Sequence, residues 1–533
     1  MTATSERPLR PLPPGLAALG ACISGLFYFL AFPGIDLWPF ALVAFVPFYI
    51  ALEGQAPKRA AWLGLLQGAT MNATGFYWLM GMLKTFSGFP APICAFFVLI
   101  VATFQGGRSA LHGYLYARIR QRFAVEGRDP GALRPLVFLG TFAAAELVFP
   151  ALFTWYFAGV THDTPVLAQT ADLAGPILVG VVLLCTNVAA GELLLAKLER
   201  RTLDRRIPGV ALGVFALAIV YGLGRIAQID AKAAAAEPLK VGLVQGNLGL
   251  MQKREDPGEG LRRHKRLTQE LRQKGAELVV WSESSVTFAV PEAMYGPFMK
   301  DRVSGSAGVP LIFGAVVYRV DPDRERWFNT ALSSNQKGDV TARYDKHYLL
   351  AFGEYLPFGE ELPILHKWSP NSGRFSKGKE FSPLLFTRDG KDHKLGTLIC
   401  YEDILPRFTN DLVNEAKPDL LVNITNDAWF GDTLEPWQHL ALAKMRAVEH
   451  HRYLVRATNS GVSAVIDPVG RTLGHTKTFQ PETLEATVHF LSDGTLYEVV
   501  GDAPWLLVTV AMLYLAFLAK QKKPAPAEAP KAA

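Results

Sequence analysis

The chain has 533 residues, half of them hydrophobic and only 19% charged. It is too long for one ordinary domain and too apolar for an ordinary water-soluble protein, so a membrane-embedded part is predicted. The formal net charge of +6 is largely explained by basic loops between apolar segments, and it requires no nucleic-acid partner.

Eight apolar segments approach the length of a transmembrane helix, which needs about 20 mostly apolar residues. They centre on residues 15–32, 37–52, 60–83, 90–110, 135–153, 175–196, 208–224 and 504–519. The sequence between the seventh and eighth has an ordinary globular composition. We therefore predict an N-terminal bundle of about seven helices (1–225), a globular domain (226–500), a C-terminal transmembrane helix (501–520) and a disordered cytoplasmic tail (521–533).

Basic residues occur in every second connection between the apolar segments. Since Lys and Arg near the ends of spans tend to stay in the cytoplasm, this pattern predicts cytoplasmic termini and a globular domain on the outer, periplasmic face. The connections Pro33 to Asp36 and His162 to Asp172 are nearly free of such charge. The basic residues are Arg7, Arg10, Lys58, Arg59, Arg118, Arg120, Arg122, Arg128, Arg134, Lys197, Arg200, Arg201, Arg205, Arg206, Lys520, Lys522 and Lys523.

Polar residues inside the predicted spans are energetically unfavourable in lipid, so a structural or functional role is expected for them. Glu146 either lines a lipid-entry cavity or pairs with another helix, and the sequence leaves both readings open. Three of the four cysteines, Cys22, Cys94 and Cys185, also lie in predicted spans and are read as small buried hydrophobes. Cys400 is alone in the globular domain, so it has no disulfide partner there, and a free thiol in an oxidising compartment indicates a reactive role.

The globular domain alternates short apolar runs with helical patterns, which predicts layered α/β structure. The runs are nearly continuous in apolar residues, as expected of strands covered on both faces. Helices are predicted over 259–274, 407–416 and 436–450. Strands are predicted at Leu239–Gln245, Leu278–Ser282, Leu311–Tyr318, Leu395–Ile399, Leu420–Thr425, Leu454–Thr458 and Ser463–Asp467.

Glu283 and Cys400 each follow such a strand, and Lys346 lies in Tyr-Asp-Lys-His-Tyr. Side chains beyond the carboxyl ends of neighbouring strands can converge on one site. A thiol with a pKa of about 8.5 becomes a good nucleophile when a base takes its proton or a cation stabilises the thiolate. Glu283 fits the base and Lys346 the cation, which would also stabilise an oxyanion. The three residues predict acyl transfer through a thioester.

The sequence around these residues resembles the nitrilase, or carbon–nitrogen hydrolase, superfamily. It is most similar to the membrane-embedded bacterial branch of that superfamily, the apolipoprotein N-acyltransferases. The resemblance implies a nitrilase-like αββα sandwich outside a helical membrane bundle. The matching segments are 244–247 (VQGN), 279–283 (VVWSE), 344–346 (YDK), 352–357 (FGEYLP), 399–402 (ICYE), 425–431 (TNDAWFG), 436–439 (PWQH), 445–449 (MRAVE) and 456–461 (RATNSG).

The resemblance also implies a reaction and a location. An acyl chain would pass from a phospholipid, typically phosphatidylethanolamine, to Cys400 and then to the α-amino group of the N-terminal diacylglyceryl-cysteine of an apolipoprotein. This would be the last step of lipoprotein maturation, in the bacterial inner membrane. Glu354 and Glu402 match supporting carboxylates of the family, and Tyr401 and Asn329 match residues that line the site.

Two segments depart from the family pattern, and two other functions remain open. Trp-Ser-Glu at 281–283 replaces Trp-Pro-Glu, and Leu-Ala-Phe-Gly-Glu at 350–354 replaces Val-Pro-Phe-Gly-Glu. Neither departure removes a reacting group, and both concern loop shape near Lys346 and Glu354. The alternatives are a membrane-tethered amidase, in which water resolves the acyl-enzyme, and a transporter with an outer binding domain. The histidines His439, His450 and His451 match no common metal-site spacing, and no Gly-rich nucleotide loop is present. We therefore expect no metal, cofactor or nucleotide.

Overall fold

The structure is a computed structural model that describes residues 11–125, 133–249, 256–322, 324–350 and 373–519, together with 353–356, 359, 362 and 364. The chain forms two compact units. The first contains the chain up to Thr161, Pro176–Tyr221 and the part that begins at Asp502, and the second contains His162–Gly175 and Gly222–Gly501. The predicted tail, 521–533, and the basic residues Arg7, Arg10, Arg128, Lys520, Lys522 and Lys523 lie outside the described residues. The predicted domain boundaries stay predictions.

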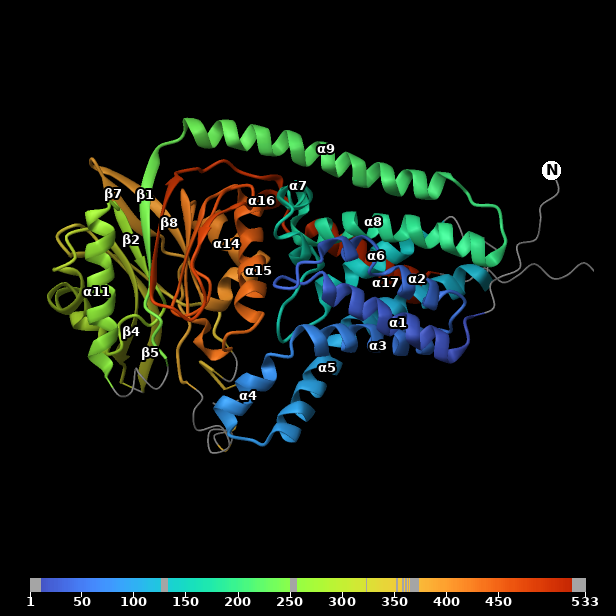
Figure 1. Cartoon of the computed structure of the whole chain (residues 1–533), viewed down its shortest axis with the longest axis horizontal. Helices are drawn as coiled ribbons and strands as arrows, with labels where there is room; N and C mark the ends of the chain where they lie inside the picture. The colour runs from blue at the N-terminus through green and yellow to red at the C-terminus, as the bar shows by residue number, and fades with distance from the viewer. Residues whose placement is uncertain are drawn as a thin grey trace, which may run out of the picture. The chain divides into compact units, whose positions relative to one another are not determined.

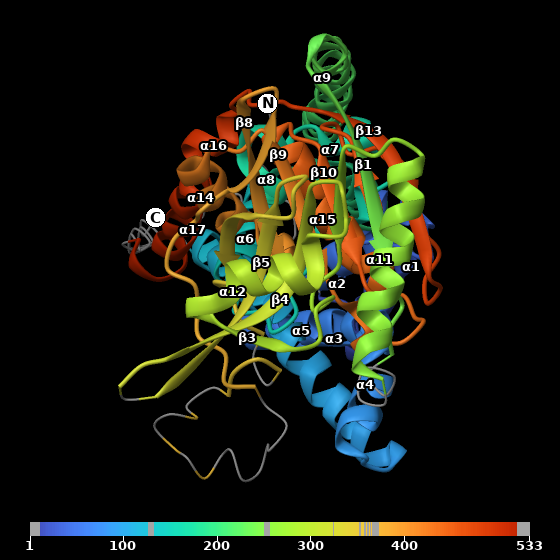
Figure 2. The ribbon, with the colours of Figure 1, turned by 90° about the vertical axis from the view of Figure 1, so that its left-hand side faces the viewer.

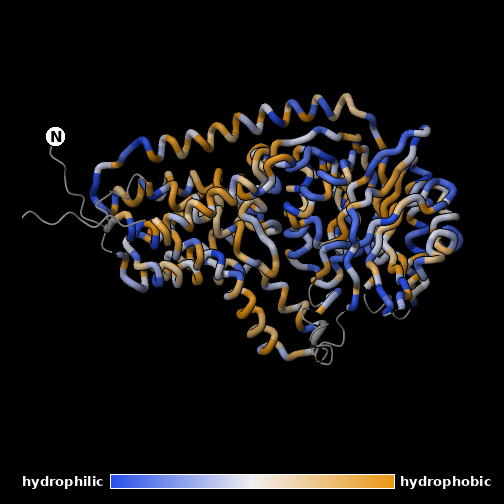
Figure 3. The backbone as a smooth tube through the Cα atoms, turned by 180° about the vertical axis from the view of Figure 1, so that it is seen from behind, coloured by the Kyte–Doolittle hydropathy of each residue, from blue (hydrophilic) through white to orange (hydrophobic). Residues whose placement is uncertain are grey.

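Every apolar segment singled out in the sequence contains a helix, and hydrophobic residues dominate these helices (Figure 3). Among the described residues, three helices are both long and apolar enough to cross a membrane: Ala91–Phe123, Ala171–Glu199 and Arg206–Ala235. The number of eight spans therefore stays a prediction. The helices are α1 (Pro14–Leu30), α2 (Val46–Leu52), α3 (Pro57–Gly75), α4 (Leu79–Ser87), α5 (Ala91–Val125), α6 (Arg134–Val148), α7 (Pro165–Ala168), α8 (Ala171–Glu199), α9 (Arg206–Ala235) and α17 (Ala503–Leu513), with shorter turns η1 (Trp38–Leu42), η2 (Phe157–Thr161) and η7 (Tyr514–Leu518).

Close contact between α3 and α5 depends on glycine. A Cβ atom on Gly64 would lie 2.1 Å from the Ser109 carbonyl oxygen, and one on Gly68 would lie 2.7 Å from Gly106 Cα. Small residues of this kind let helix backbones approach in a membrane, where tight packing drives association. The buried Glu146 of α6 accepts a hydrogen bond from the Phe157 amide at 3.0 Å, and its carboxylate lies 3.7 Å from the Arg108 guanidinium of α5. The observed contact is thus with another helix.

The second unit contains two β-sheets. One sheet has the strand order β13-β1-β2-β4-β5-β6, with β3 added beside β4, and the other has the order β12-β11-β10-β9-β8-β7. The strands of the first sheet are β1 (Pro238–Gln245), β2 (Leu278–Trp281), β3 (Ala289–Pro291), β4 (Leu311–Val320), β5 (Glu325–Ser334), β6 (Val340–Asp345) and β13 (Glu482–His489). Those of the second are β7 (Leu384–Arg388), β8 (Lys391–Ile399), β9 (Leu420–Thr425), β10 (Leu454–Thr458), β11 (Ala464–Ile466) and β12 (Thr472–His475).

The two sheets stack face to face, with helices on both outer sides (Figure 1). Successive side chains of a strand point to opposite faces, so one strand serves two cores. In β2, Leu278 and Val280 join the core shared with the second sheet, whereas Val279 and Trp281 pack in the core under α11. Figure 2 shows α11 and α12 lying over the first sheet. The helices are α11 (Pro257–Gln273), α12 (Tyr295–Met299), α14 (Pro406–Ala416), α15 (Glu435–His450) and α16 (Leu496–Val500), and the short turns are η3 (Glu292–Met294), η4 (Lys300–Ser304), η5 (Cys400–Ile404) and η6 (Asp427–Trp429).

Candidate active site

Three of the predicted site residues follow the ends of strands in the two sheets. Glu283 comes two residues after β2, Lys346 directly after β6, and Cys400 directly after β8. The Lys346 ammonium lies 3.6 Å from a Glu283 oxygen, and the thiol of Cys400 is close enough for the charges of Glu283 and Lys346 to act on it. The fold therefore brings a carboxylate, an ammonium and a thiol to one place.

Glu354 and Asn329 complete the surroundings of the lysine. Lys346 Nζ lies 2.9 Å from Glu354 Oε2, and the Asn329 side-chain amide donates to Glu283 at 2.6 Å and to Glu354 at 2.7 Å. Asn329 lies on β5, and its carbonyl oxygen also accepts a hydrogen bond from the Lys346 backbone amide at 2.8 Å. Two carboxylates thus surround one cation, and the asparagine fixes their spacing.

The Lys346 side chain is almost fully buried, with 1% of its surface exposed. Burial alone lowers the pKa of Lys346, but Glu354 and Glu283 reverse this effect and raise it well above its ordinary value. The side chain is therefore a stable cation. Two carboxylates lie at 2.9 and 3.6 Å from the ammonium nitrogen, and because an ammonium can donate three hydrogen bonds, one donor would remain for a developing oxyanion.

Cys400 occupies an unusual backbone conformation. Its φ is 52°, in the left-handed region that residues with a side chain rarely adopt. Such outliers are held in place by their surroundings, and they concentrate at functional sites. The residue keeps part of its surface accessible. Burial and the negative charge of Glu283 raise the pKa of the thiol well above its ordinary value, although Lys346 opposes this. Cys400 therefore rests as a thiol, and it would need a base to act as a nucleophile.

Glu402 joins the turn after β8 to the loop after β6. Its carboxylate accepts hydrogen bonds from the Ile399 amide at 2.8 Å, the His347 and Tyr348 amides at 2.7 and 3.0 Å, and the Tyr344 hydroxyl at 3.0 Å. Burial raises the pKa of Glu402, the donating backbone amides and the charge of Lys346 oppose this, and the resulting pKa is about 7. Glu402 thus sets the spacing between the segments that carry Lys346 and Cys400.

Aromatic stacking supports the same two segments. The Tyr401 ring stacks on the Tyr348 ring, with centroids 5.8 Å apart and planes 17° apart. His347 lies between the rings of Tyr344 and Phe381, with centroid distances of 5.2 and 4.7 Å. Burial lowers the pKa of His347, so the ring is neutral and acts as a packing residue.

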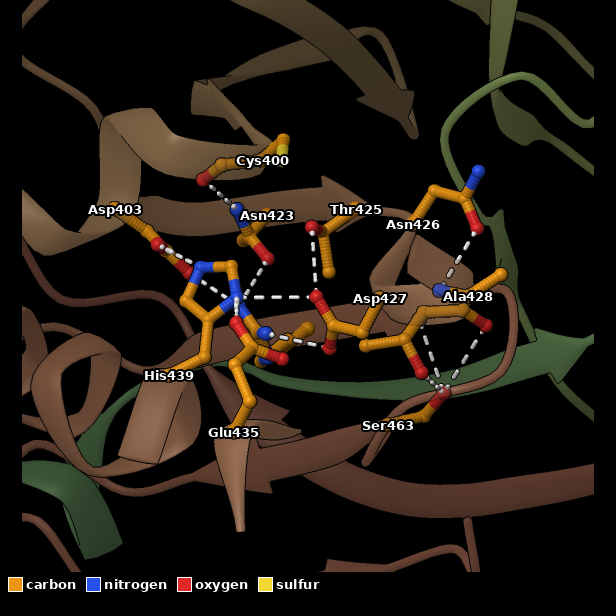
Figure 4. Close-up of polar contacts among 12 residues, drawn as sticks. Cys400, Asp403, Asn423, Thr425, Asn426, Asp427, Ala428, Glu435, His439 and Ser463 are labelled. Carbon is orange, nitrogen blue, oxygen red and sulfur yellow. Dashed lines mark hydrogen bonds and ion pairs between the residues drawn. The ribbon is translucent and has the colours of Figure 1, made fainter. Parts of the chain in front are cut away.

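A buried charged cluster behind Cys400 was not predicted from the sequence. His439 of α15 contacts Asp403 at 2.8 Å and Asp427 at 3.0 Å, and Arg456 of β10 contacts both aspartates. Figure 4 shows Asp403, Asp427 and His439, with Asn423 between them and the Cys400 carbonyl. The signal in the sequence was a charged residue within an apolar strand, Leu-Val-Arg-Ala-Thr at 454–458.

Asp427, Glu435 and His439 form the group of possible metal ligands found among the described residues. Their surroundings do not favour a cation. Both ring nitrogens of His439 already face carboxylates, and the Arg456 guanidinium supplies a positive charge beside Asp427. Burial and the charge of Asp427 raise the pKa of Glu435 well above its ordinary value, so its carboxyl is neutral. We assign no metal to this group.

Known protein families match both the helical part and the α/β part of the chain. Residues 24–189 match the family model of the apolipoprotein N-acyltransferase N-terminal domain, and residues 240–492 match that of carbon–nitrogen hydrolases. The second match confirms the predicted nitrilase-like domain. An amidase from Nesterenkonia sp. has a solved structure that is similar at 20% identity, with a TM-score of 0.35, over 50% of this chain and 95% of the amidase.

Three curated relatives match nearly the whole chain, and each is named apolipoprotein N-acyltransferase. The protein of Geobacter metallireducens is 30% identical over 95% of this chain and 95% of its own length. That of Pseudomonas putida is 31% identical over 96% of this chain and 98% of its own length. That of Vibrio cholerae is 30% identical over 94% of this chain and 96% of its own length.

Proposed function

The chain belongs to the apolipoprotein N-acyltransferase family, and from this premise we propose that Glu283, Lys346 and Cys400 carry an acyl chain from a phospholipid to a lipoprotein amine. The chain is an acyltransferase that N-acylates lipoproteins. The observation that carries the proposed mechanism is the grouping of a thiol on a left-handed backbone with a buried cation and a carboxylate at the strand ends.

In the first half-reaction Glu283 takes the proton of the Cys400 thiol, and the thiolate attacks the carbonyl carbon of the phospholipid ester. Lys346 and a backbone N–H near Tyr401 stabilise the oxyanion that forms. The C–O bond then breaks, and Glu283 returns the proton to the departing lysophospholipid alkoxide. The acyl chain remains on Cys400 as a thioester.

In the second half-reaction the free α-amino group of a diacylglyceryl-cysteine attacks the thioester. Glu283 accepts a proton from the amine, the C–S bond breaks, and Glu283 passes the proton to the departing thiolate, which restores the thiol. The products are an amide and the free enzyme. No external energy source is needed, because the overall reaction exchanges an ester for a more stable amide.

The membrane part of the chain suits these substrates. A site in bulk water would have to extract each acyl chain at about 0.8 kcal/mol per CH₂ group. We propose eight spans with cytoplasmic termini and the hydrolase domain on the periplasmic side, supported by the helices in each apolar segment and the basic residues in alternate loops. A reporter that is active only in the periplasm, inserted at Gly390 on the β7–β8 hairpin, should be active, and the same reporter after Ala533 should be silent. The reverse pattern would refute the orientation.

Transfer can be followed with phosphatidylethanolamine carrying a labelled acyl chain and a synthetic peptide that begins with diacylglyceryl-cysteine. We expect the label in an amide on that peptide, because the thioester needs a free amine. A peptide whose α-amino group is acetylated is the matched control and should stay unlabelled. Release of labelled fatty acid at the same rate with either peptide would identify a hydrolase instead, and no turnover of the lipid would refute the acyl-transfer proposal.

A further inference from the structure

The Cys400 turn has anchors that the reaction itself does not use. Cys400 has a left-handed backbone conformation and begins a short turn, η5, that directly follows the buried end of strand β8. Asn423 of the neighbouring strand β9 donates to the Leu398 carbonyl at 3.1 Å and to the Cys400 carbonyl at 3.5 Å. Asp403, three residues after the nucleophile, is fully buried. Both anchors hold the backbone and leave the thiol free.

Each anchor is held by the same arginine. Arg456 Nη1 donates to Asp403 and, at 2.8 Å, to the Asn423 side-chain oxygen, while Nη2 donates to Asp427 at 3.2 Å. His439 joins the two aspartates from the other side, through Nε2 to Asp403 and through Nδ1 to Asp427. The planar guanidinium fork can meet three acceptors at once, which a lysine ammonium on a flexible chain does less well.

The cluster is balanced in charge. Both ring nitrogens of His439 face carboxylates, so both carry hydrogen and the ring is a cation. Burial and the charge of Arg456 lower the pKa of His439, but Asp403 and Asp427 outweigh them and raise it to about 10. The two cations, His439 and Arg456, thus offset the two aspartates. The remaining neighbour of the ring, Glu435, is neutral.

We propose that the network of Asp403, Asp427, His439 and Arg456 fixes the backbone of the Cys400 turn and thereby positions the thiol for attack on the acyl donor. All four side chains are buried, so they act through the turn as positioning residues. The inference rests on the proposed function of Cys400 and identifies what keeps that nucleophile in place.

Stability alone is a weak reason for such a network. Four charges lose their water on burial, and well-packed apolar residues often stabilise a core as well or better. The charged side chains add a defined orientation of the turn, because each of their hydrogen bonds has a preferred geometry. Thr425 extends the network toward the nucleophile, since its hydroxyl lies 3.5 Å from Asp427 and also hydrogen-bonds the Cys400 thiol.

The test compares Arg456→Lys with Arg452→Lys in the full-length protein. Arg452 is a similarly buried arginine whose described hydrogen bonds go to the Pro418 and His450 carbonyls and to Glu498, not to the Cys400 turn. The rate constant for acyl-enzyme formation from phosphatidylethanolamine should fall about 100-fold in Arg456→Lys, as expected when a reacting group is misplaced by about 1 Å. It should stay within about threefold of the wild type in Arg452→Lys, although both variants lose thermal stability.

The KM for the lipid should be unchanged in Arg456→Lys, because the network does not touch the donor. The rate of Cys400 alkylation by iodoacetamide should fall in the same variant. Equal rates of acylation and alkylation in the two folded variants would overturn the proposal. If the wild type forms no acyl-enzyme, the proposed function fails, and the alkylation comparison still decides whether the network positions the thiol.

A second measurement uses the wild type and does not depend on how the variants fold. Backbone amides that are held by a buried network exchange with solvent as slowly as the surrounding core. The amides of 401–404 should therefore exchange as slowly as those of β9. Exchange at the rate of an exposed loop would overturn the proposal.

Discussion

Replacing Lys346 with methionine is expected to reduce the rate of acyl-enzyme formation by at least about 10³-fold, the upper range for loss of one oxyanion donor. A second effect adds to this loss. Without the ammonium, the carboxylates of Glu283 and Glu354 stay close together and buried, so one of them binds a proton and Glu283 becomes a poorer base. The measurement is the rate of thioester formation followed by intact mass.

Lys300→Met is the matched control, because Lys300 pairs with Asp339 at 2.6 Å on the exposed surface. Its acylation rate should equal that of the wild type. The double variant Lys346→Met/Glu354→Gln removes the excess negative charge, so it should recover thermal stability but not acylation. Acylation at more than a tenth of the wild-type rate in either Lys346 variant would remove the lysine from the mechanism.

Replacing Glu283 with glutamine should slow acylation by about 10² to 10⁴-fold near pH 7, the range that general-base catalysis supplies. The raised pKa of the Cys400 thiol explains why a base is needed. Without the base, only the small fraction of Cys400 that is ionised at a given pH can react. At pH values below the pKa of the thiol this fraction grows about tenfold per pH unit, so the acylation rate of the variant should rise by the same factor. The pH profile of single-turnover acylation measures this.

Glu292→Gln serves as the control, since Glu292 is a carboxylate paired with Arg343 and Arg319 away from the thiol. We expect its rate and pH profile to match the wild type. A Glu283→Gln profile that is as flat as the wild-type profile would show that another group accepts the thiol proton.

The sequence predicted the apolar strands and missed the more polar ones. The runs at Leu239–Gln245, Leu311–Tyr318 and Leu420–Thr425 form β1, β4 and β9 with shifts of one or two residues at most. The strand β5 begins Glu-Arg-Trp-Phe-Asn and β6 reads Val-Thr-Ala-Arg-Tyr-Asp, and polar residues interrupt both, so they lack the continuous apolar signal used for the others. β5 pairs antiparallel with β4, and β6 pairs antiparallel with β5, so both lie outside the parallel centre of the sheet.

Site residues, like strands, were easiest to predict from the sequence where they lie beside a continuous apolar run. Glu283 and Cys400 were visible because each ends an apolar run, whereas Asn329 was expected only through the resemblance, since β5 was not predicted. Asp403 and Arg456 are 53 residues apart and meet only when β8, β9 and β10 pair side by side. A buried arginine in an apolar strand does predict a buried acidic partner, but it does not say which one.

The central claim is that Cys400 becomes acylated, and intact mass tests it most directly. The purified protein is incubated with a diacyl phospholipid in the absence of an amine acceptor, beside the Cys400→Ala variant. We predict a mass gain of one acyl chain that is lost on treatment with hydroxylamine and is absent from the variant. A folded wild-type protein that gains no mass, or a variant that gains the same mass, would contradict the account.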